Sequence, residues 1–279
     1  MQPVQAPAVR WWQALDPPIY LISVLPGVAT WLLAGSGDRG LVTIAAATLA
    51  VILLQHAINV LNDVSDWRLG ADAEKYHSWA RFHQQDLGVA ALHGYASLLA
   101  GGLLGLVILA QAEKFWILAF AAPLVLLGYL YNAGSRPLSY TSLGEWVTGL
   151  CYGPGVFGCL WLLAGGGMTI ELAAGSTAFL ALAMALLLSH QPAQVDTDRQ
   201  AGKHTFAVRY GVSATRRTAQ GLFVVFLLAL LIAIKQSNLA TATAITSLLC
   251  AIIAAGILLR MQPAPRRILT GATAVLLVT

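Results

Sequence analysis

Residues that suit the binding of a divalent cation gather between Asn59 and Lys75. Asn59, Asn62, Asp63 and Asp66 recur at intervals of three and four residues, so a helix would carry them along one polar stripe. Carboxylate and amide oxygens are the ligands that Mg²⁺ prefers in proteins. A solvated helix end with acidic caps is the alternative. It explains single acids, but not repeated Asn and Asp on one face.

The same stretch offers one further carboxylate. Asp72 lies nine residues, or about two and a half helical turns, beyond Asp63, so it leaves the polar stripe if the helix continues. Gly70 supplies a helix stop between them. Asp72 therefore joins the cluster only if the chain turns at Gly70.

A second oxygen-rich stretch runs from Ser189 to Thr205. Gln194 and Asp198 are four residues apart and would share a helical face, whereas Asp196 would point elsewhere on a helix. Mg²⁺ bridging the two clusters would suit a diphosphate, provided that cationic side chains surround it. The cationic candidates near the two stretches are Lys75, Arg136, Lys203 and Arg209.

Composition places the chain in a membrane. Of its 279 residues 58% are hydrophobic and 10% charged, against about a quarter charged in soluble domains. Apolar runs recur near the length of about 20 residues that crosses a bilayer. They predict an all-α bundle of about nine transmembrane helices in a single domain, residues 1–279, with a short tail at 1–16. The runs cover 17–35, 41–61, 87–110, 115–131, 143–164, 170–190, 218–234, 239–259 and a short 267–279.

The basic residues predict the orientation. Thirteen Lys and Arg residues fall at the N-terminus and in the even-numbered connections, and only Arg39, Lys114 and Lys235 fall on the other side. The positive-inside rule then puts the N-terminus in the cytoplasm. Both acidic stretches lie on that side, because four crossings separate them. The connections after the second and sixth helices would form a cytoplasmic cap over the site, in a multi-pass protein of the cytoplasmic (inner) membrane.

This arrangement suits a substrate with a diphosphate head and an apolar tail. The implied chemistry is ionisation of an allylic diphosphate, with metal and bases stabilising the leaving group and aromatic rings the carbocation. Tyr131 and Tyr140 flank Arg136 and are the aromatic candidates, although an interfacial aromatic belt with a positive-inside Arg is the alternative for this connection. Glu145 follows, just inside the fifth apolar run, where an ionisable group is costly.

Two other classes of protein, a membrane transporter and a nucleic-acid-binding protein, fit these residues less well. A membrane transporter would place ionisable or broken segments near the bilayer midplane, whereas these acids sit at helix ends on one side. An internal duplication would also give two acidic stretches, so symmetry alone does not exclude a transporter. No basic face stands apart from the membrane loops, which argues against a nucleic-acid partner.

The motifs resemble those of the UbiA-type intramembrane aromatic prenyltransferases over nearly the whole chain. The first motif is Asn62-Asp63-x-x-Asp66-x-x-x-Gly70-x-Asp72, in the form typical of the 1,4-dihydroxy-2-naphthoate branch. The second is Asp198-x-x-x-Gly202-Lys203-x-Thr205, and the connection from Tyr131 to Glu145 also resembles that branch. The resemblance implies transfer of a polyprenyl chain from its diphosphate to an aromatic acceptor within the lipid bilayer, most simply 1,4-dihydroxy-2-naphthoate in menaquinone-type synthesis.

The resemblance also implies roles for single residues. Diphosphate would be held by Lys75, Arg136, Lys203 and Arg209, and the carbocation or the acceptor would be lined by Tyr131 and Tyr140. Asp63, Asp66 and Asp198 would act in catalysis. The Mg²⁺ ligands would be Asn62, Asp63, Asp66, Asp72, Gln194 and Asp198.

The main departure from the family pattern is Gln194, where many members have Asp. An amide oxygen can still bind Mg²⁺, but without charge; Asp196 would supply the charge only if its backbone were not helical. Other acceptors left open are 4-hydroxybenzoate, homogentisate and a chlorophyllide-like ring.

Overall fold

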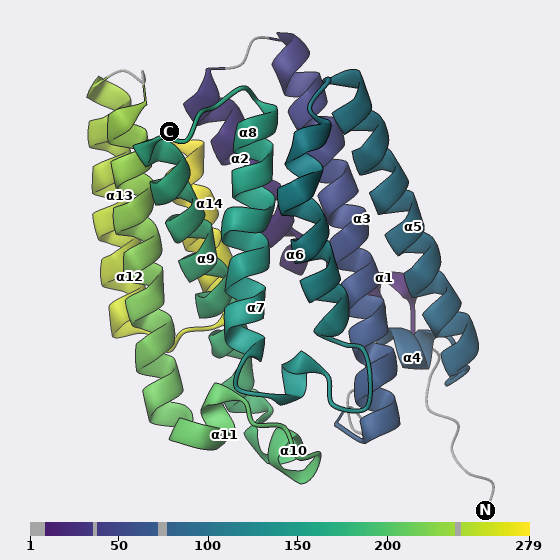
Figure 1. The fold of residues 1–279 in the computed structure, drawn as a ribbon. Helices are drawn as coiled ribbons and strands as arrows, with labels where there is room; N and C mark the ends of the chain where they lie inside the picture. The colour runs from purple at the N-terminus through teal and green to yellow at the C-terminus, as the bar shows by residue number, and fades with distance from the viewer. Residues whose placement is uncertain (1–8, 36–37, 72–76, 238–240) are drawn as a thin grey trace, which may run out of the picture.

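The chain folds as a bundle of helices in the computed structural model, which describes residues 9–35, 38–71, 77–237 and 241–279 (Figure 1). Within these ranges there is no β-strand, so the prediction of an all-α fold is confirmed. Asp72 and Lys75 lie outside the described residues. The elements of the first half are α1 (Trp11–Leu15), η1 (Pro17–Tyr20), α2 (Leu21–Ala34), α3 (Asp38–Leu69), α4 (Trp79–Phe82), α5 (Leu87–Gln111), η2 (Phe115–Ile117) and α6 (Leu118–Leu130).

The second half begins with a short turn and a helix of mixed type, then continues in longer helices. Its elements are η3 (Leu138–Tyr140), α7 (Gly144–Leu150), η4 (Cys151–Gly158), α8 (Cys159–Leu163), α9 (Ile170–His190), η5 (Gln191–Ala193), α10 (Val195–Gln200), α11 (Phe206–Tyr210), α12 (Val212–Gln236), α13 (Thr241–Arg260) and α14 (Pro265–Leu277).

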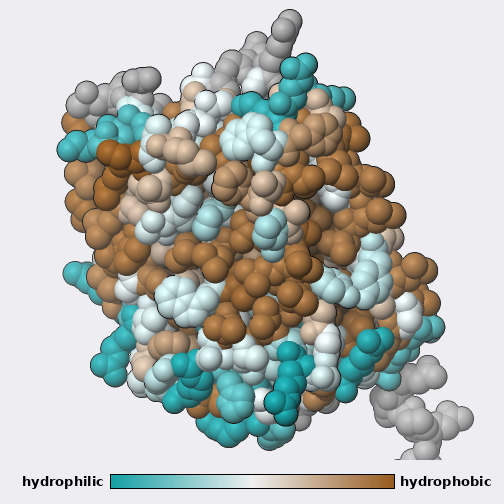
Figure 2. Space-filling model, viewed as in Figure 1, coloured by the Kyte–Doolittle hydropathy of each residue, from teal (hydrophilic) through white to brown (hydrophobic). Residues whose placement is uncertain are grey.

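Seven helical stretches among the described residues are long and apolar enough to cross a bilayer. The apolar helix at Phe115–Leu130 is shorter, and α14 has only 13 residues. Nine crossings therefore stay a prediction. Figure 2 shows the apolar surface as a broad band, with hydrophilic residues at the two ends. Large exposed apolar side chains such as Leu99, Leu103 and Ile253 suit contact with lipid.

The bundle packs around α9, which is among its most buried helices. Phe179 of α9 lies between Phe157 and Phe226, with ring centroids 5.3 and 6.1 Å away. The fifth apolar run changes to a π-helix at η4, where Pro154 lacks the N–H that an α-helix would use. Gly153 in this stretch has no side chain to collide with the Ser176 carbonyl, so η4 approaches α9 closely.

The segments that carry the two acidic motifs meet at one end of the bundle. Figure 1 shows α4, α10 and α11 at the end where α3 finishes, with the 131–143 connection beside them. The backbone carbonyl of Tyr140 in that connection accepts the His204 backbone N–H at 3.0 Å. The helices thus hold residues 62–66 and 194–205 close together, although four long helical segments separate them in sequence.

Candidate active site

A lysine joins the two acidic motifs. The Lys203 ammonium lies 2.8 Å from Asp66 Oδ2 and 3.8 Å from Asp198 Oδ1. Thr205 donates to the other Asp198 oxygen at 3.3 Å. Both carboxylates are about 95% buried, at 4% and 5% exposure, so a cation between them is needed to offset their repulsion.

These side chains line a cavity of about 90 Å³. Asn62 reaches it from α3, Tyr131 and Ser139 from the connection after α6, and Gln194 from the start of α10. The cavity presents carboxylates, amide oxygens and one ammonium. It thereby brings together six predicted site residues: Asn62, Asp66, Tyr131, Gln194, Asp198 and Lys203.

Asp63 faces another way. Its Oδ2 accepts the backbone N–H of Trp79 at 2.7 Å, and its side chain is 5% exposed. It holds the start of α4 against α3 and does not line the cavity. One helical residue is a turn of about 100°, which separates Asp63 from Asn62 on the helix surface. A metal-ligand role for Asp63 stays a prediction.

Asp196 and Asp198 point in different directions, because the segment is helical. Asp196 pairs with Arg199 at 3.0 Å, with its side chain 81% exposed. The structure thus places Gln194 and Asp198 on the cavity and Asp196 on the outer surface.

We expect Gln194→Leu to raise the Mg²⁺ concentration needed for turnover, since it removes an oxygen from the cavity. Gln194 is an exposed residue at the cavity, so water can replace part of the lost contact and the loss of Mg²⁺ affinity should be modest. Gln194→Asp should hold or improve Mg²⁺ affinity. The matched control is Asp196→Asn, which should leave the Mg²⁺ requirement unchanged. The reverse order in Mg²⁺ titrations of turnover would make Asp196 the ligand.

The predicted anion-binding and aromatic residues are not all at the cavity. Arg136 and Arg209 are exposed, and the Arg209 guanidinium lies 4.6 Å from the ring centroid of Tyr210. Tyr140 is buried, and the Lys203 ammonium lies 4.8 Å from its ring centroid. Its face therefore already stabilises a positive charge at this place. Diphosphate binding by the two arginines stays a prediction.

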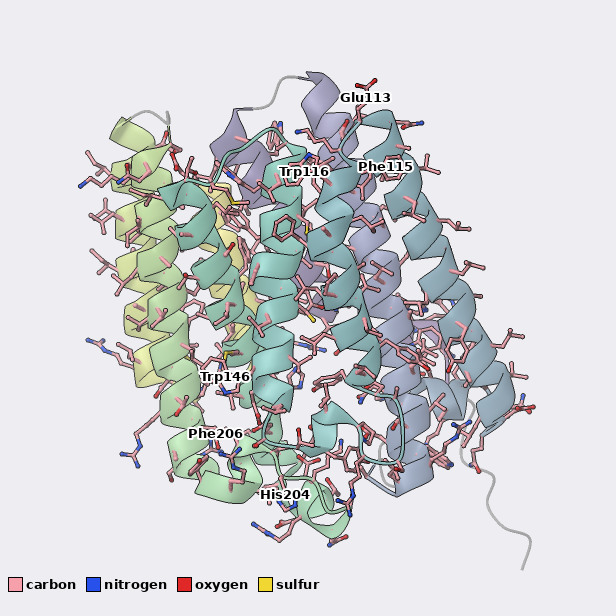
Figure 3. The ribbon with its side chains drawn as sticks, viewed as in Figure 1. Glu113, Phe115, Trp116, Trp146, His204 and Phe206 are labelled. Carbon is pink, nitrogen blue, oxygen red and sulfur yellow. The ribbon has the colours of Figure 1, made fainter. Side chains whose placement is uncertain are left out.

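Glu145 is an ionisable residue inside an apolar run, and the sequence analysis assigned it no role in the site. Its Oε1 accepts the Gln191 amide at 2.8 Å and the Phe206 backbone N–H at 2.7 Å. Gln191 in turn accepts the Ala207 N–H at 3.1 Å. The two side chains cap the first turn of α11, next to the segment that carries Lys203 (Phe206 and His204 are labelled in Figure 3).

We expect Glu145→Leu to destabilise the protein by about 1–3 kcal/mol, because a buried backbone N–H and the Gln191 amide lose their acceptor. Glu145→Gln keeps an acceptor oxygen and should retain most of the stability. Thermal unfolding in detergent would compare them. Equal stability of wild type and Glu145→Leu would contradict this capping role.

A chain of histidines links three helices beside the site. Tyr20 Oη lies 2.7 Å from His56 Nδ1, and His56 Nε2 lies 3.0 Å from His93 Nε2. His93 Nδ1 lies 3.1 Å from His83 Nε2. The Trp79 ring packs edge-on against His56 and His93, with centroids 4.9 Å away. These contacts tie the α4 segment to α3 and α5.

Acidification should weaken the contact of His83 with His93, and thereby lower the stability of the protein. Burial lowers the pKa of His83, while nearby Asp86 opposes the shift. A lowered pKa means that protons bind the unfolded state more tightly, so stability is full above the ordinary value of about 6.5 and falls as pH drops below it. We expect the unfolding temperature to fall between pH 7.5 and pH 5.5, and to fall less in His83→Gln. An equal fall in both proteins would exclude His83 as the cause.

The donor set at the cavity fits a hard divalent cation. Asn62, Asp66, Gln194 and Asp198 offer only oxygen as ligand atoms there, and two of the four are charged. The Lys203 ammonium between the two carboxylates shows that their geometry accepts positive charge. An all-helical bundle with helices long enough to cross a membrane and such a cavity at one end defines a class: multi-pass membrane proteins with an oxygen-rich polar site at one end.

Comparison with known proteins identifies the family. The model of the UbiA prenyltransferase family matches residues 21–272, so the chain belongs to this family and is a prenyl-transferring enzyme. The resemblance inferred from the motifs is thereby confirmed.

The chain is 32% identical to the 1,4-dihydroxy-2-naphthoate octaprenyltransferase of Mycobacterium tuberculosis over 203 residues, 71% of this chain and 67% of that protein. It is 29% identical to the 2-carboxy-1,4-naphthoquinone phytyltransferase of Synechocystis over 76% of this chain and 70% of that protein. The fold matches a UbiA homolog from Archaeoglobus fulgidus, solved bound to GPP and Mg²⁺. That match has a TM-score of 0.67, 15% identity and coverage of 95% of both chains.

Proposed function

We propose that the protein transfers a polyprenyl chain from its diphosphate to 1,4-dihydroxy-2-naphthoate, in a step of menaquinone-type quinone synthesis that depends on Mg²⁺. The observation that carries this proposal is the meeting of Asp66, Asp198 and Lys203 at one cavity, although 137 residues separate Asp66 from Lys203. The names of the similar 1,4-dihydroxy-2-naphthoate octaprenyltransferases support the choice of acceptor. The whole chain, 1–279, acts as one domain in this proposal.

The chain's own residues divide the work. Asn62, Asp66, Gln194 and Asp198 would hold Mg²⁺, with Asp72 as a further ligand. The ion supplies charge stabilisation to the departing diphosphate. Lys203 would bind diphosphate oxygen directly, and Lys75, Arg136 and Arg209 would add positive charge around it. The apolar tail would run between the helices.

The bond between prenyl C1 and the diphosphate oxygen breaks and leaves an allylic cation. The faces of Tyr131 and Tyr140 would stabilise this cation. The ring carbon that bears the acceptor's carboxylate then attacks C1, and the carboxylate leaves as carbon dioxide, which returns its bonding electrons to the ring. The balance needs neither an oxidant nor a reductant.

The acceptor can be tested in membranes. Labelled polyprenyl diphosphate would be incubated with each acceptor in turn, and the lipid products analysed. We expect a prenylated naphthoquinol only with 1,4-dihydroxy-2-naphthoate. Product with 4-hydroxybenzoate, homogentisate or a chlorophyllide-like ring instead would move the protein to another acceptor, and no product with any of them would revive the transporter alternative.

We place the N-terminus and the cavity on the cytoplasmic side of the inner membrane, on the basis of the distribution of Lys and Arg. Single cysteines at positions 114 and 203 would be labelled in intact cells. Label should enter from outside at 114 only. Labelling from outside at 203 would invert the orientation.

A further inference from the structure

Asn132 lies outside every residue set predicted from the sequence, yet it contacts the site. It lies two residues beyond the end of α6 and is 7% exposed. Its amide nitrogen donates to the Ile58 carbonyl of α3 at 2.8 Å. Its amide oxygen accepts the amide nitrogen of Asn62 at 2.9 Å. The Asn132 side chain thus bonds to two residues of α3, Ile58 and Asn62, which lie one helical turn apart.

The bond to Ile58 fixes which way both amides face. A backbone carbonyl can only accept a hydrogen bond, so the NH₂ group of Asn132 must face Ile58. The oxygen of Asn132 is then turned to Asn62, which must present its own NH₂ group. The remaining polar atom of the Asn62 amide is its oxygen, on the opposite branch. No donor to that oxygen is found among residues 9–35, 38–71, 77–237 and 241–279.

This orientation decides what Asn62 can do at the cavity that it lines. With its NH₂ group held by Asn132, its oxygen is the atom left for a cation. If the amide turned over, N–H groups would face the cation and repel it, and two oxygens would face each other at Asn132. A partner that fixes a ligand in this way raises metal affinity without touching the metal.

We propose that Asn132 is a positioning residue, which holds the oxygen of Asn62 toward a divalent cation shared with Asp66 and Asp198. This inference rests on the proposed function, because it requires the metal site there. It assigns Asn132 no contact with substrate. Its effect is on metal affinity, and thereby on the Mg²⁺ concentration that turnover requires.

The test uses the full-length protein in detergent and follows free Mn²⁺, as a stand-in for Mg²⁺, by electron paramagnetic resonance. We expect Asn132→Leu to weaken Mn²⁺ binding about tenfold or more, the range known for partners of metal ligands. Asn132→Asp loses the donor to the Ile58 carbonyl but presents only acceptor oxygens. The Asn62 NH₂ group should therefore still face it, and most of the wild-type Mn²⁺ affinity should remain. This variant also covers the case in which Asn132→Leu does not fold.

A double-mutant cycle separates orientation from general damage. In Asn62→Asp the ligand has two equivalent oxygens, so turning it over changes nothing. Adding Asn132→Leu to this variant should therefore not weaken Mn²⁺ binding. In kinetics, Asn132→Leu alone should raise the half-saturating Mg²⁺ concentration, while kcat at saturating Mg²⁺ stays close to wild type.

Three results would overturn the proposal, and they differ in whether the proposed function also fails. Wild-type Mn²⁺ affinity in Asn132→Leu would remove the positioning role and leave the proposed function intact. An equal loss of affinity in the Asn62→Asp background would show a general structural effect. A wild-type protein that binds no Mn²⁺ would remove the metal site, and with it both proposals.

Discussion

Asp66→Asn is expected to lower kcat on the order of 10²–10³-fold, the range seen when one preorganised charge-stabilising group is removed. The substitution keeps the shape of the side chain and removes one of the two carboxylates that face Lys203 in the cavity. A neutral amide binds a divalent cation less tightly, and the Lys203 ammonium loses its partner at 2.8 Å. Steady-state turnover with labelled polyprenyl diphosphate would measure the loss.

The matched control is Asp196→Asn, which removes the same charge from the outer face of α10, where the side chain is 81% exposed. It should leave turnover near the wild-type value. A similar loss in both variants would point to the total charge of this end of the bundle. Wild-type turnover in Asp66→Asn would remove Asp66 from the mechanism.

Lys203→Met is expected to cost both stability and activity. Removing one partner of a buried ion pair destabilises a protein by about 3–5 kcal/mol, because the remaining charge is left without compensation. Here two buried carboxylates would face each other, and the Lys203 side chain that now separates them is itself only 11% exposed. The unfolding temperature without metal should fall clearly.

Added Mg²⁺ should reverse part of this effect. Because a divalent cation supplies the missing positive charge, Mg²⁺ should raise the unfolding temperature more in Lys203→Met than in wild type. Turnover should stay low, since the diphosphate has lost its ammonium contact. Lys203→Arg keeps the charge and serves as control. Mg²⁺ shifts of equal size in wild type and Lys203→Met would show that the ion binds elsewhere.

Much of the architecture was predictable, because it follows from local patterns. Apolar runs of membrane-spanning length gave the helices, and spacing of four residues put Gln194 and Asp198 on one face. Spacing of three and four residues also put Asn62 and Asp63 on one polar stripe. In the structure Asn62 bonds to Asn132, whereas Asp63 bonds to the Trp79 N–H. Asp63 accepts the N–H of Trp79, 16 residues further along the chain, and no local pattern predicts a contact over that separation.

The rest of the site depends on pairs that are distant in sequence. Glu145 meets Gln191 across 46 residues and Asn62 meets Asn132 across 70. Both pairs form only when α3, the α6 connection, α7 and α9 have packed. Composition marks Glu145 as costly inside a membrane helix, but it says nothing of the residue that satisfies it. Asn132 is a polar residue in a polar connection, so no sequence pattern distinguishes it as part of the site.

The central claim is that this cavity transfers a prenyl group by metal-assisted departure of diphosphate. The most direct measurement is a single turnover of the purified protein with polyprenyl diphosphate and 1,4-dihydroxy-2-naphthoate, in which prenylated lipid, diphosphate and carbon dioxide are counted. We predict equal amounts of all three with Mg²⁺, and none in excess chelator until Mg²⁺ is restored. Full transfer in excess chelator, or prenylated lipid without release of diphosphate, would contradict the account.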